Sequence, residues 1–454
     1  MISRIVFREE HLAQLRQLLF DHPGLEGAAF VLCGQAQHAG IQKLISHAVI
    51  AIAEEDFLLR EPDRLSIGSR ALVRITKLAR YENLSVLFAH SHPGGMCAFS
   101  EQDDHEEANL IPFLDARLPG RLHGTAVLTS DSIVARLFAP ECIEPDAILS
   151  VGERIRVLQS SANHALPAFF DRQVRAFGKE NQAILRALRI GVVGMGGTGS
   201  PLAEQLYRLG VGDLIFFDGD HLDQTNLNRV YGAKLADVGL PKVDIAKRRL
   251  DEVGFDTRIH AVPEHITWEE PAKLLTSCDV IFGCTDKQVP RAILTFLSLR
   301  YAIPVFDTGV LIDSIDGELR GIHGRVTTLL PGEACLFCRE RISSEAMRVE
   351  GLSEVDRERQ IKDGYAPELA EPAPAVVAFT SAVASFSVCE FLHRITGFMG
   401  ENRHSTELLI NFDQSKLRTN RVDAGEDCIC TSDALFGRGD EEPFLGMIWP
   451  TRTK

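Results

Sequence analysis

The chain has 454 residues, which is too long for a single compact core, so we expect two or three domains of ordinary size. Its 63 acidic and 48 basic residues give a formal charge of −15, which argues against nucleic acid and anionic membranes as partners. The first residues carry charges where an export signal needs an apolar core, so we do not expect export. Ten cysteines in such a chain are expected to be free thiols or metal ligands, which predicts a reducing cytoplasm.

The first 145 residues alternate between short apolar runs and amphipathic stretches. This alternation predicts a mixed α/β domain over residues 1–145, followed by a linker helix over residues 146–167. Strands are expected at residues 28–34, 47–53, 84–90, 124–130 and 132–139, and helices at 10–20, 69–82 and 101–115.

Beyond the linker the pattern becomes a regular alternation of strand and helix, which predicts a Rossmann-like, doubly wound domain over residues 168–454. A crossover insertion is expected at residues 339–375, and the uncharged run at 372–389 predicts a buried helix rather than a membrane span. The predicted fold class is therefore α/β throughout. The expected strands are 188–193, 213–218, 257–262, 278–283 and 303–307.

Two histidines, one residue apart, end the apolar run of residues 84–90. On an extended strand His90 and His92 point to the same side, and Asp103, in the first turn of the next helix, can face back toward them. Two imidazoles and one carboxylate make three ligands, the number that catalytic zinc takes while leaving a fourth position to water. Ser100 and Asp103 also have the spacing of a helix capping box, so taken singly these residues have a structural explanation.

Together these residues spell H-x-H-P-x6-S-x2-D, a constellation that resembles the JAB/JAMM zinc metalloprotease family over residues 1–145. The resemblance implies a catalytic zinc ion on His90, His92 and Asp103 and an oxyanion contact from Ser100. It also implies cleavage after the C-terminal glycine of ubiquitin and ubiquitin-like proteins.

The same family needs a glutamate on an early strand to move protons between the attacking water and the leaving amine. Glu26 lies just before the first apolar strand and is the preferred match. Glu54 and Glu55, at the end of the next strand, are the alternatives.

A second motif lies in RIGVVGMGGTGSPLAEQL, where a strand runs into a glycine-rich loop and then a helix. Glycines let the backbone approach a polyphosphate, and the N-terminus of the helix favours its negative charge. Asp218 ends the next strand, at the place of a ribose-binding carboxylate. The glycines of the loop are Gly194, Gly196, Gly197 and Gly199.

This loop alone fits a nicotinamide dehydrogenase equally well. Downstream, Arg229 and Lys242 supply cations, and Asp286 supplies a carboxylate at the end of the strand VIFGCTD. Breaking ATP between its α- and β-phosphates needs such groups for the polyphosphate and for magnesium, whereas hydride transfer needs neither. The spacing favours ATP, and an NAD-dependent oxidoreductase with an unrelated metal domain stays the alternative.

The second motif and its downstream charges resemble the ThiF/MoeB family and the adenylation domains of ubiquitin-activating enzymes, over about residues 168–435. The resemblance implies that Asp218 and Asn226 hold the nucleoside. It further implies that Arg229 and Lys242 contact the phosphates and that Asp286 binds magnesium.

Two further positions bear on this resemblance. Arg172 matches an arginine that reaches into the ATP site of the partner subunit, which implies a homodimer. Lys287 is a departure, because the family usually has an asparagine after the aspartate.

The same family often holds a structural zinc ion with two C-x-x-C pairs. Cys335 and Cys338 match the first pair, while Cys428 and Cys430 form a shorter C-x-C in place of the second. Four thiolates would complete a tetrahedral zinc site, so the resemblance implies two zinc ions per chain, one catalytic and one structural.

Conjugating members of the family carry a thioester-forming cysteine in or near the crossover, yet residues 339–388 contain no cysteine. Cys284 and Cys389 are poor candidates for that role. The simpler hypothesis is that the acyl-adenylate passes to a separate thiol, on a conjugating enzyme or a sulfur acceptor, or to a small nucleophile.

These features lead to one hypothesis: a fused enzyme that trims or deconjugates a ubiquitin-like protein with zinc and adenylates its C-terminal glycine with ATP and magnesium. The alternatives are the NAD-dependent oxidoreductase and a non-catalytic binding scaffold. The expected partners are a ubiquitin-like protein and a second copy of the chain, with no nucleic acid and no membrane.

Overall fold

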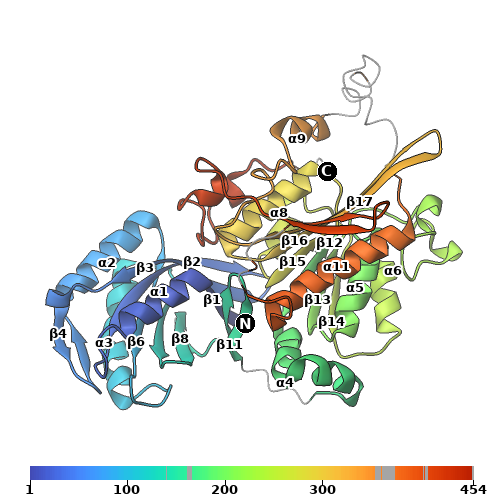
Figure 1. Ribbon diagram of the computed structural model, residues 1–454. Helices are drawn as coiled ribbons and strands as arrows, with labels where there is room; N and C mark the ends of the chain where they lie inside the picture. The colour runs from blue at the N-terminus through green and yellow to red at the C-terminus, as the bar shows by residue number, and fades with distance from the viewer. Residues whose placement is uncertain are drawn as a thin grey trace. The chain divides into compact units, whose positions relative to one another are not determined.

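The computed structural model describes residues 1–139, 141–160, 166–352, 359, 374–401, 403 and 407–451. Its chain divides into two compact units, both visible in Figure 1. The first unit comprises Met1–Asn163, Arg300–Ala302 and Asp433–Gly446, and the second comprises His164–Leu299, Ile303–Ser432 and Met447–Lys454. The domain predicted for residues 168–454 therefore needs a correction, because residues 433–446 belong to the first unit.

The first unit is built on a mixed sheet in which, over the described residues, nine strands follow the order β11-β10-β1-β3-β2-β6-β7-β8-β9. A separate hairpin, β4 (Phe57–Arg60) with β5 (Leu65–Ile67), stands beside it. The strands of the large sheet are β1 (Ile2–Arg8), β2 (Ala28–His38), β3 (Ile41–Ala51), β6 (Ser85–Ser91), β7 (His123–Leu128), β8 (Ile133–Ala139), β9 (Glu141–Ile143), β10 (Ala147–Val151) and β11 (Ile155–Ser160).

Helices cover both faces of this sheet. Helix α1 (Glu9–Leu19) packs in one core with Ala29 and Val31 of β2, and α2 (Ser69–Glu82) and α3 (Glu101–Arg117) pack in another with Ala28 and Phe30. Successive residues of a strand point to opposite faces, so α1 lies on one side of the sheet and the other two helices lie on the opposite side.

The linker helix predicted for residues 146–167 is wrong, since residues 147–160 form the antiparallel pair β10 and β11. The turn at Gly152 separates two short segments, and neither is long enough for the apolar spacing of an amphipathic helix. All five residues of β10 are buried, and its pairing with β1 is parallel. A partner nearly 150 residues away leaves no local sign in the sequence. Residues 161–165 lie outside the described chain.

We call residues 433–446 the C-terminal strap. It pairs with β2 through Gly34 N–H to Gly437 O (3.0 Å) and Asp440 N–H to Gln35 O (2.7 Å). Gly437 and Gly439 have φ of +58° and +66°, and a Cβ on Gly439 would collide with the backbone oxygen of Gln35. The close approach therefore requires glycine, and it explains why a distant segment belongs to the first unit.

The second unit has a sheet whose order, over the described residues, is β14-β13-β12-β15-β16-β17-β18-β19. The strands from β14 to β16 are parallel, as expected, and those from β16 to β19 pair antiparallel, which the doubly wound prediction did not include. The bounds are β12 (Arg189–Val193), β13 (Asp213–Phe217), β14 (Arg258–Val262), β15 (Val280–Gly283), β16 (Val305–Ile315), β17 (Glu318–Leu329), β18 (Glu407–Asn411) and β19 (Lys416–Asn420).

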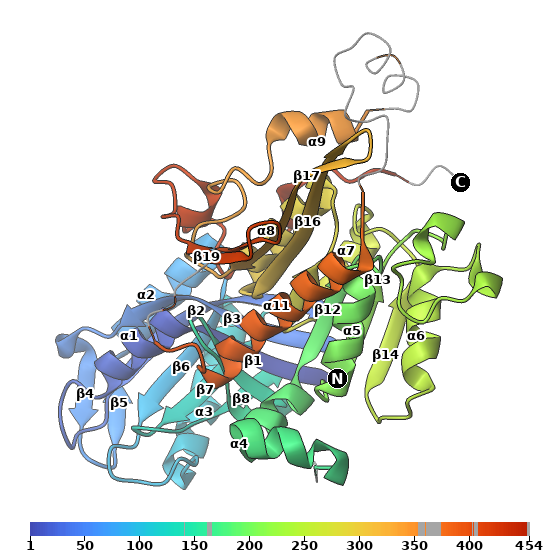
Figure 2. The same ribbon diagram turned by 45° about the vertical axis from the view of Figure 1, so that its right-hand side comes forward.

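Helix α11 (Val377–Thr396), expected as a buried helix, lies along α5 (Gly199–Arg208), as Figure 2 shows. Its Val383 packs in one apolar cluster with Val326 of the sheet. Among the described residues, no helix is long and apolar enough to span a membrane. Most of the predicted crossover insertion, residues 353–358 and 360–373, lies outside the described chain. The other helices are α4 (Asp171–Ala187), α6 (Lys242–Asp251), α7 (Glu269–Leu275), α8 (Gln288–Tyr301) and α9 (Ser344–Glu350).

Candidate functional site

The two histidines of the first unit are held by a central strand. His90 lies in β6, which is paired on both sides by β2 and β7, and the N–H of His92 donates to Leu128 O at 2.9 Å just beyond the strand. Asp103 comes from the first turn of α3, whose N-cap is Ser100. A rigid strand and a helix start thus direct all three side chains to one place.

The three proposed ligands converge. The distances are 2.9 Å from His90 Nε2 to Asp103 Oδ1, 3.5 Å from His92 Nε2 to Asp103 Oδ2, and 3.2 Å between the two Nε2 atoms. His92 Nδ1 donates to Met96 O at 3.3 Å, so Nε2, which faces Asp103, is the nitrogen that would bind an ion once it has lost its proton. The donor set therefore fits a zinc ion with three protein ligands.

The charged groups of this cluster shift one another's pKa values. Burial alone would raise the pKa of Asp103, but hydrogen bonds from His90 and His92 hold it well below its usual range. The hydrogen bond to Asp103 raises the pKa of His92. Burial raises the pKa of Glu26, against the attraction of the two histidines. A carboxyl group with a raised pKa is suited to accept and return a proton near neutral pH.

The structure separates Glu26 from its alternatives. Glu26 is 5% exposed, and its Oε1 lies 3.8 Å from His92 Nε2. Glu54 and Glu55 are exposed and pair instead with Arg60 (3.4 Å) and Arg70 (3.6 Å). Glu26 is therefore the glutamate that the fold brings to the histidines.

Ser100 takes the capping role. Its backbone N–H donates to Asp103 Oδ2 at 2.6 Å, and its hydroxyl donates to the same oxygen at 2.7 Å. These bonds fix the rotamer of Asp103 as well as the helix start. Ser100 thus holds a proposed ligand in place, and contact with an oxyanion stays a prediction.

In the second unit, the glycine loop joins β12 to α5 at the carboxyl ends of the parallel strands, where ligands bind in open α/β sheets. Gly194 has a φ of +92°, and a Cβ on Gly199 would collide with the carbonyl oxygen of Gly194. Gly196 has nothing within 4 Å of the place a Cβ would take, and Gly197 has the Arg229 side chain 3.0 Å from that place. The loop thus leaves space where a polyphosphate could lie.

Asp218 anchors this loop from the end of the neighbouring strand. Its carboxylate accepts from Met195 N–H at 2.6 Å and from Asp220 N–H at 2.8 Å. Lys242 reaches the same place and pairs with Asp220 Oδ2 at 2.9 Å. Burial raises the pKa of Asp218, and the ammonium of Lys242 opposes this rise. Sequence reasoning missed Asp220, although its position two residues past a strand-ending aspartate was a usable sign.

The remaining predicted residues of this site are more exposed. Arg229 donates to Thr225 O at 2.6 Å, and Asn226 sits in a short turn whose capping residue is Asp223. Asp286 is exposed after β15, and Arg172 is exposed in the first turn of α4. The structure holds one chain, so a role for Arg172 across a dimer stays a prediction.

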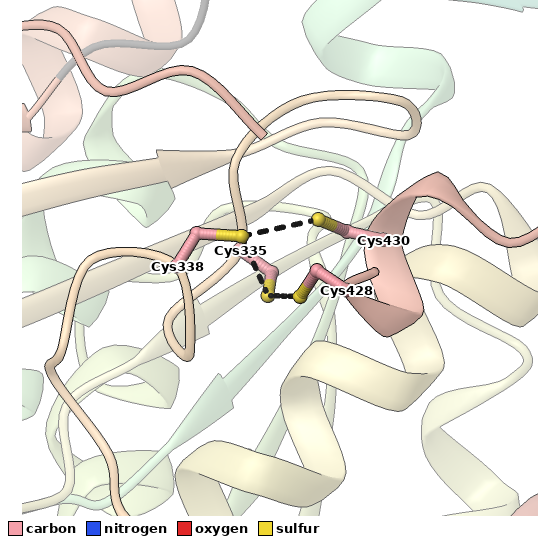
Figure 3. Close-up of side chains that lie close together, drawn as sticks. All are labelled: Cys335, Cys338, Cys428 and Cys430. Atoms are coloured by element: carbon pink, nitrogen blue, oxygen red, sulfur yellow. Dashed lines mark hydrogen bonds between the residues drawn. The ribbon is translucent and has the colours of Figure 1, made fainter. Parts of the chain in front are cut away.

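The four cysteines also converge, as Figure 3 shows. Sulfur–sulfur distances are 3.5 Å for Cys335 and Cys428, 3.4 Å for Cys338 and Cys430, and 3.9 Å within the first pair. The contact with Cys430 lowers the pKa of Cys335 to about 5, and the same contact together with burial raises the pKa of Cys430. Such unequal sharing of protons is expected of clustered thiols, and a tetrahedral metal ion fits the donor set.

Neither alternative thiol is activated. Burial raises the pKa of Cys284, which lies against the glycine loop, and of Cys389 in α11. A thiol needs a lowered pKa to act as a nucleophile near neutral pH.

Comparison with known proteins identifies the family to which the second unit is similar. The ThiF family model matches residues 170–431. The vegetative HesA protein of Trichormus variabilis is 30% identical over 163 residues, covering 36% of this chain and 58% of the relative. The tRNA threonylcarbamoyladenosine dehydratase of Bacillus subtilis is 40% identical over 22% of this chain and 39% of its own length. Ubiquitin-like modifier-activating enzyme 5 of Culex quinquefasciatus is 28% identical over 37% of this chain and 45% of its own length.

The chain thus spans about half the length of the curated relatives it matches. The family match, by contrast, extends over more than half of this chain, from the start of α4 to the cysteine cluster. It includes the glycine loop, Asp218, Lys242 and all four cysteines. The chain belongs to the ThiF family.

Proposed function

We propose that this chain is a bifunctional enzyme that adenylates the C-terminal glycine of a ubiquitin-like protein and cleaves the peptide or isopeptide bond after that glycine. The observation that carries the adenylation half is the glycine loop, tied by Met195 N–H to Asp218 and approached by Lys242, in a chain of the ThiF family. The hydrolytic half rests on the convergence of two histidines, one aspartate and the buried Glu26.

In adenylation, the substrate's terminal carboxylate bonds through oxygen to the α-phosphorus of ATP, and pyrophosphate leaves. The N–H groups of the glycine loop and the start of α5 bind polyphosphate, and Arg229 and Lys242 offset its charge. Asp218 and Asn226 hold the nucleoside, and Asp286 carries magnesium. The Lys242–Asp220 pair opens as phosphate takes the place of Asp220 beside the ammonium group.

In hydrolysis, His90, His92 and Asp103 hold zinc, which when bound supplies the acidity that makes water a nucleophile near neutral pH. Glu26 takes a proton from the attacking water and delivers it to the leaving amine. Its carboxylate is buried and lies 3.8 Å from His92 Nε2, which places it for both steps. Ser100 keeps Asp103 in its rotamer through two hydrogen bonds.

The substrate class follows from pairing the two reactions, because cleavage exposes the glycine carboxylate that adenylation activates. One matched relative is named for activating a ubiquitin-like modifier, and another for acting on a tRNA nucleoside. The formal charge of −15 favours the protein substrate. Further proposed features are a homodimer with Arg172 across its interface, a separate conjugating enzyme or sulfur acceptor, and a cytoplasmic location.

The test separates the two sites in the full-length protein. Asp286→Ala should abolish ATP–pyrophosphate exchange stimulated by a glycine-ended ubiquitin-like protein and leave cleavage of a tail fused to that glycine unchanged. Asp103→Ala should do the reverse. Loss of both activities in either variant contradicts separate sites, and NAD binding without ATP binding would establish the oxidoreductase alternative instead.

A non-catalytic scaffold would show neither activity and would take no metal at the histidines. Metal analysis of the purified chain gives the first indication. Two zinc ions per chain support the enzyme, and one ion confined to the cysteine cluster supports the scaffold.

A further inference from the structure

The three proposed zinc ligands are not held equally well. His90 and His92 belong to or directly follow a strand with neighbours on both sides, whereas Asp103 depends on where α3 begins. The first seven residues of α3 read EQDDHEE and contain no apolar side chain. The apolar residues that α3 buries, Ile111 and Leu114, come two turns later. Hydrophobic packing therefore anchors the far part of α3 and not the turn that carries Asp103.

This first turn also carries like charges. Five of the seven residues are acidic, and they crowd within two turns of one helix. A helix N-terminus favours negative charge, but carboxylates this close also repel one another. Glu107 is 9% exposed, so its carboxylate needs a partner inside the protein.

One side chain both anchors the start of α3 and offsets its negative charge. Arg136 projects from β8 and donates through Nη1 to Asp104 Oδ1 at 2.6 Å and to Glu107 Oε2 at 2.7 Å. Its guanidinium carbon also lies 4.0 Å from the ring centroid of Phe99, the residue before the N-cap. Thr125, directly opposite Arg136 on β7, donates to the other oxygen of Glu107.

Arg136 thus contacts the chain just before Asp103, just after it, and one turn further on. These contacts tie the start of α3 to the same sheet that carries the histidines, since β7 is the neighbour of both β6 and β8. We propose that Arg136 is a positioning residue that sets the Asp103 carboxylate at metal-binding distance from His90 and His92. The inference rests on the proposed zinc site and adds a residue that touches neither the metal nor the substrate.

The chain offers a matched control at the opposite end of the same helix. Arg80 of α2 donates through Nε and Nη2 to Arg117 O, the last residue of α3, at 3.2 and 2.6 Å. Arg80→Met removes an arginine contact from α3 about 21 Å from Asp103, taking 1.5 Å per residue. Loosened packing of α3 alone would affect both variants alike.

The measurement is the affinity of the full-length protein for cobalt(II), with spectra that separate the two sites. Thiolate ligands at the cysteine cluster give a charge-transfer absorption that imidazole and carboxylate ligands lack. Arg136→Met should weaken cobalt binding at the histidine site about tenfold, the low end of what loss of an outer-shell partner costs. Arg80→Met should leave that affinity unchanged, and Arg136→Lys should restore part of it.

A second pair of variants keeps the test decisive if Arg136→Met does not fold. Asp104→Asn removes one contact of Arg136, whereas Glu106→Gln removes an equal charge from the same turn, where Glu106 pairs with Gln102 at 3.0 Å. Asp104→Asn should weaken cobalt binding, and Glu106→Gln should not. Equal affinities in the two, or equal losses in Arg136→Met and Arg80→Met, would overturn the inference and leave the zinc site standing. Absence of cobalt from the histidines of the unmodified protein would overturn the zinc site itself.

Discussion

The contact between the C-terminal strap and β2 allows a sharp test with two glycines of similar conformation. Gly439 and Gly446 have φ of +66° and +65°, so alanine at either position costs about 1 kcal/mol for the left-handed backbone. At Gly446 nothing lies within 4 Å of the added Cβ, whereas at Gly439 the Cβ collides with the backbone of Gln35. The strap must then move away from β2 in the Gly439→Ala variant alone.

The cost of that movement follows from the hydrogen bonds it breaks. Three backbone bonds hold the strap here: Gly439 N–H to Arg300 O, Asp440 N–H to Gln35 O, and Gly34 N–H to Gly437 O. At about 1 kcal/mol each, their loss brings the total for Gly439→Ala to about 4 kcal/mol, against about 1 kcal/mol for Gly446→Ala.

The assay is amide hydrogen exchange of β2 peptides, together with urea unfolding followed by circular dichroism. Trp268 and Trp449 both belong to the second unit, so their emission monitors that unit separately. Gly439→Ala should expose β2 to exchange and leave the tryptophan transition unchanged. Equal behaviour of the two variants would refute the assignment of the strap to the first unit.

Three further outcomes are expected. Burial, and then the charge of Arg8, lower the pKa of His11 to about 4. The free energy of unfolding of the first unit should therefore be highest above about pH 6.5 and should fall by about 3 kcal/mol as the pH drops to 4. His11→Gln should remove this pH dependence in acid-unfolding curves. Lys242→Met should slow ATP–pyrophosphate exchange about 100-fold, while Lys247→Met, which removes a half-buried cation from the same helix, should not. Cys430→Ser should lower the zinc content by one ion per chain and destabilise the second unit, as metal analysis and the tryptophan transition would record.

Local patterns predicted much of the fold. The parallel strands β12 to β16 and the helices α1, α2, α3 and α11 each carry their own apolar periodicity, and the α/β class with a Rossmann-type domain is confirmed. What failed depends on distant partners. Strand β10 is parallel to β1, and the C-terminal strap lies on β2 about 400 residues away in sequence, so no window of the sequence contains either pairing.

The candidate sites show the same division. The spacing of His90, His92 and Asp103 follows from strand and helix periodicity, and the structure brings their ligand atoms within 4.8 Å of one another. No local pattern in the sequence separates Glu26 from Glu54, because tertiary packing decides which of the two lies near the histidines. Arg136 left no sign at all, since its partners Asp104 and Glu107 are about 30 residues away along the chain.

In the proposed function, both reactions act on the same end of one substrate. Intact-mass spectrometry tests it directly, with a ubiquitin-like protein that carries a short tail beyond its terminal glycine, incubated with the full-length chain, zinc, magnesium and ATP. We expect loss of the tail followed by gain of one AMP on the exposed glycine, with no AMP on the uncut protein. A substrate that keeps its tail and its mass, or one that gains AMP before the tail is lost, would contradict the claim.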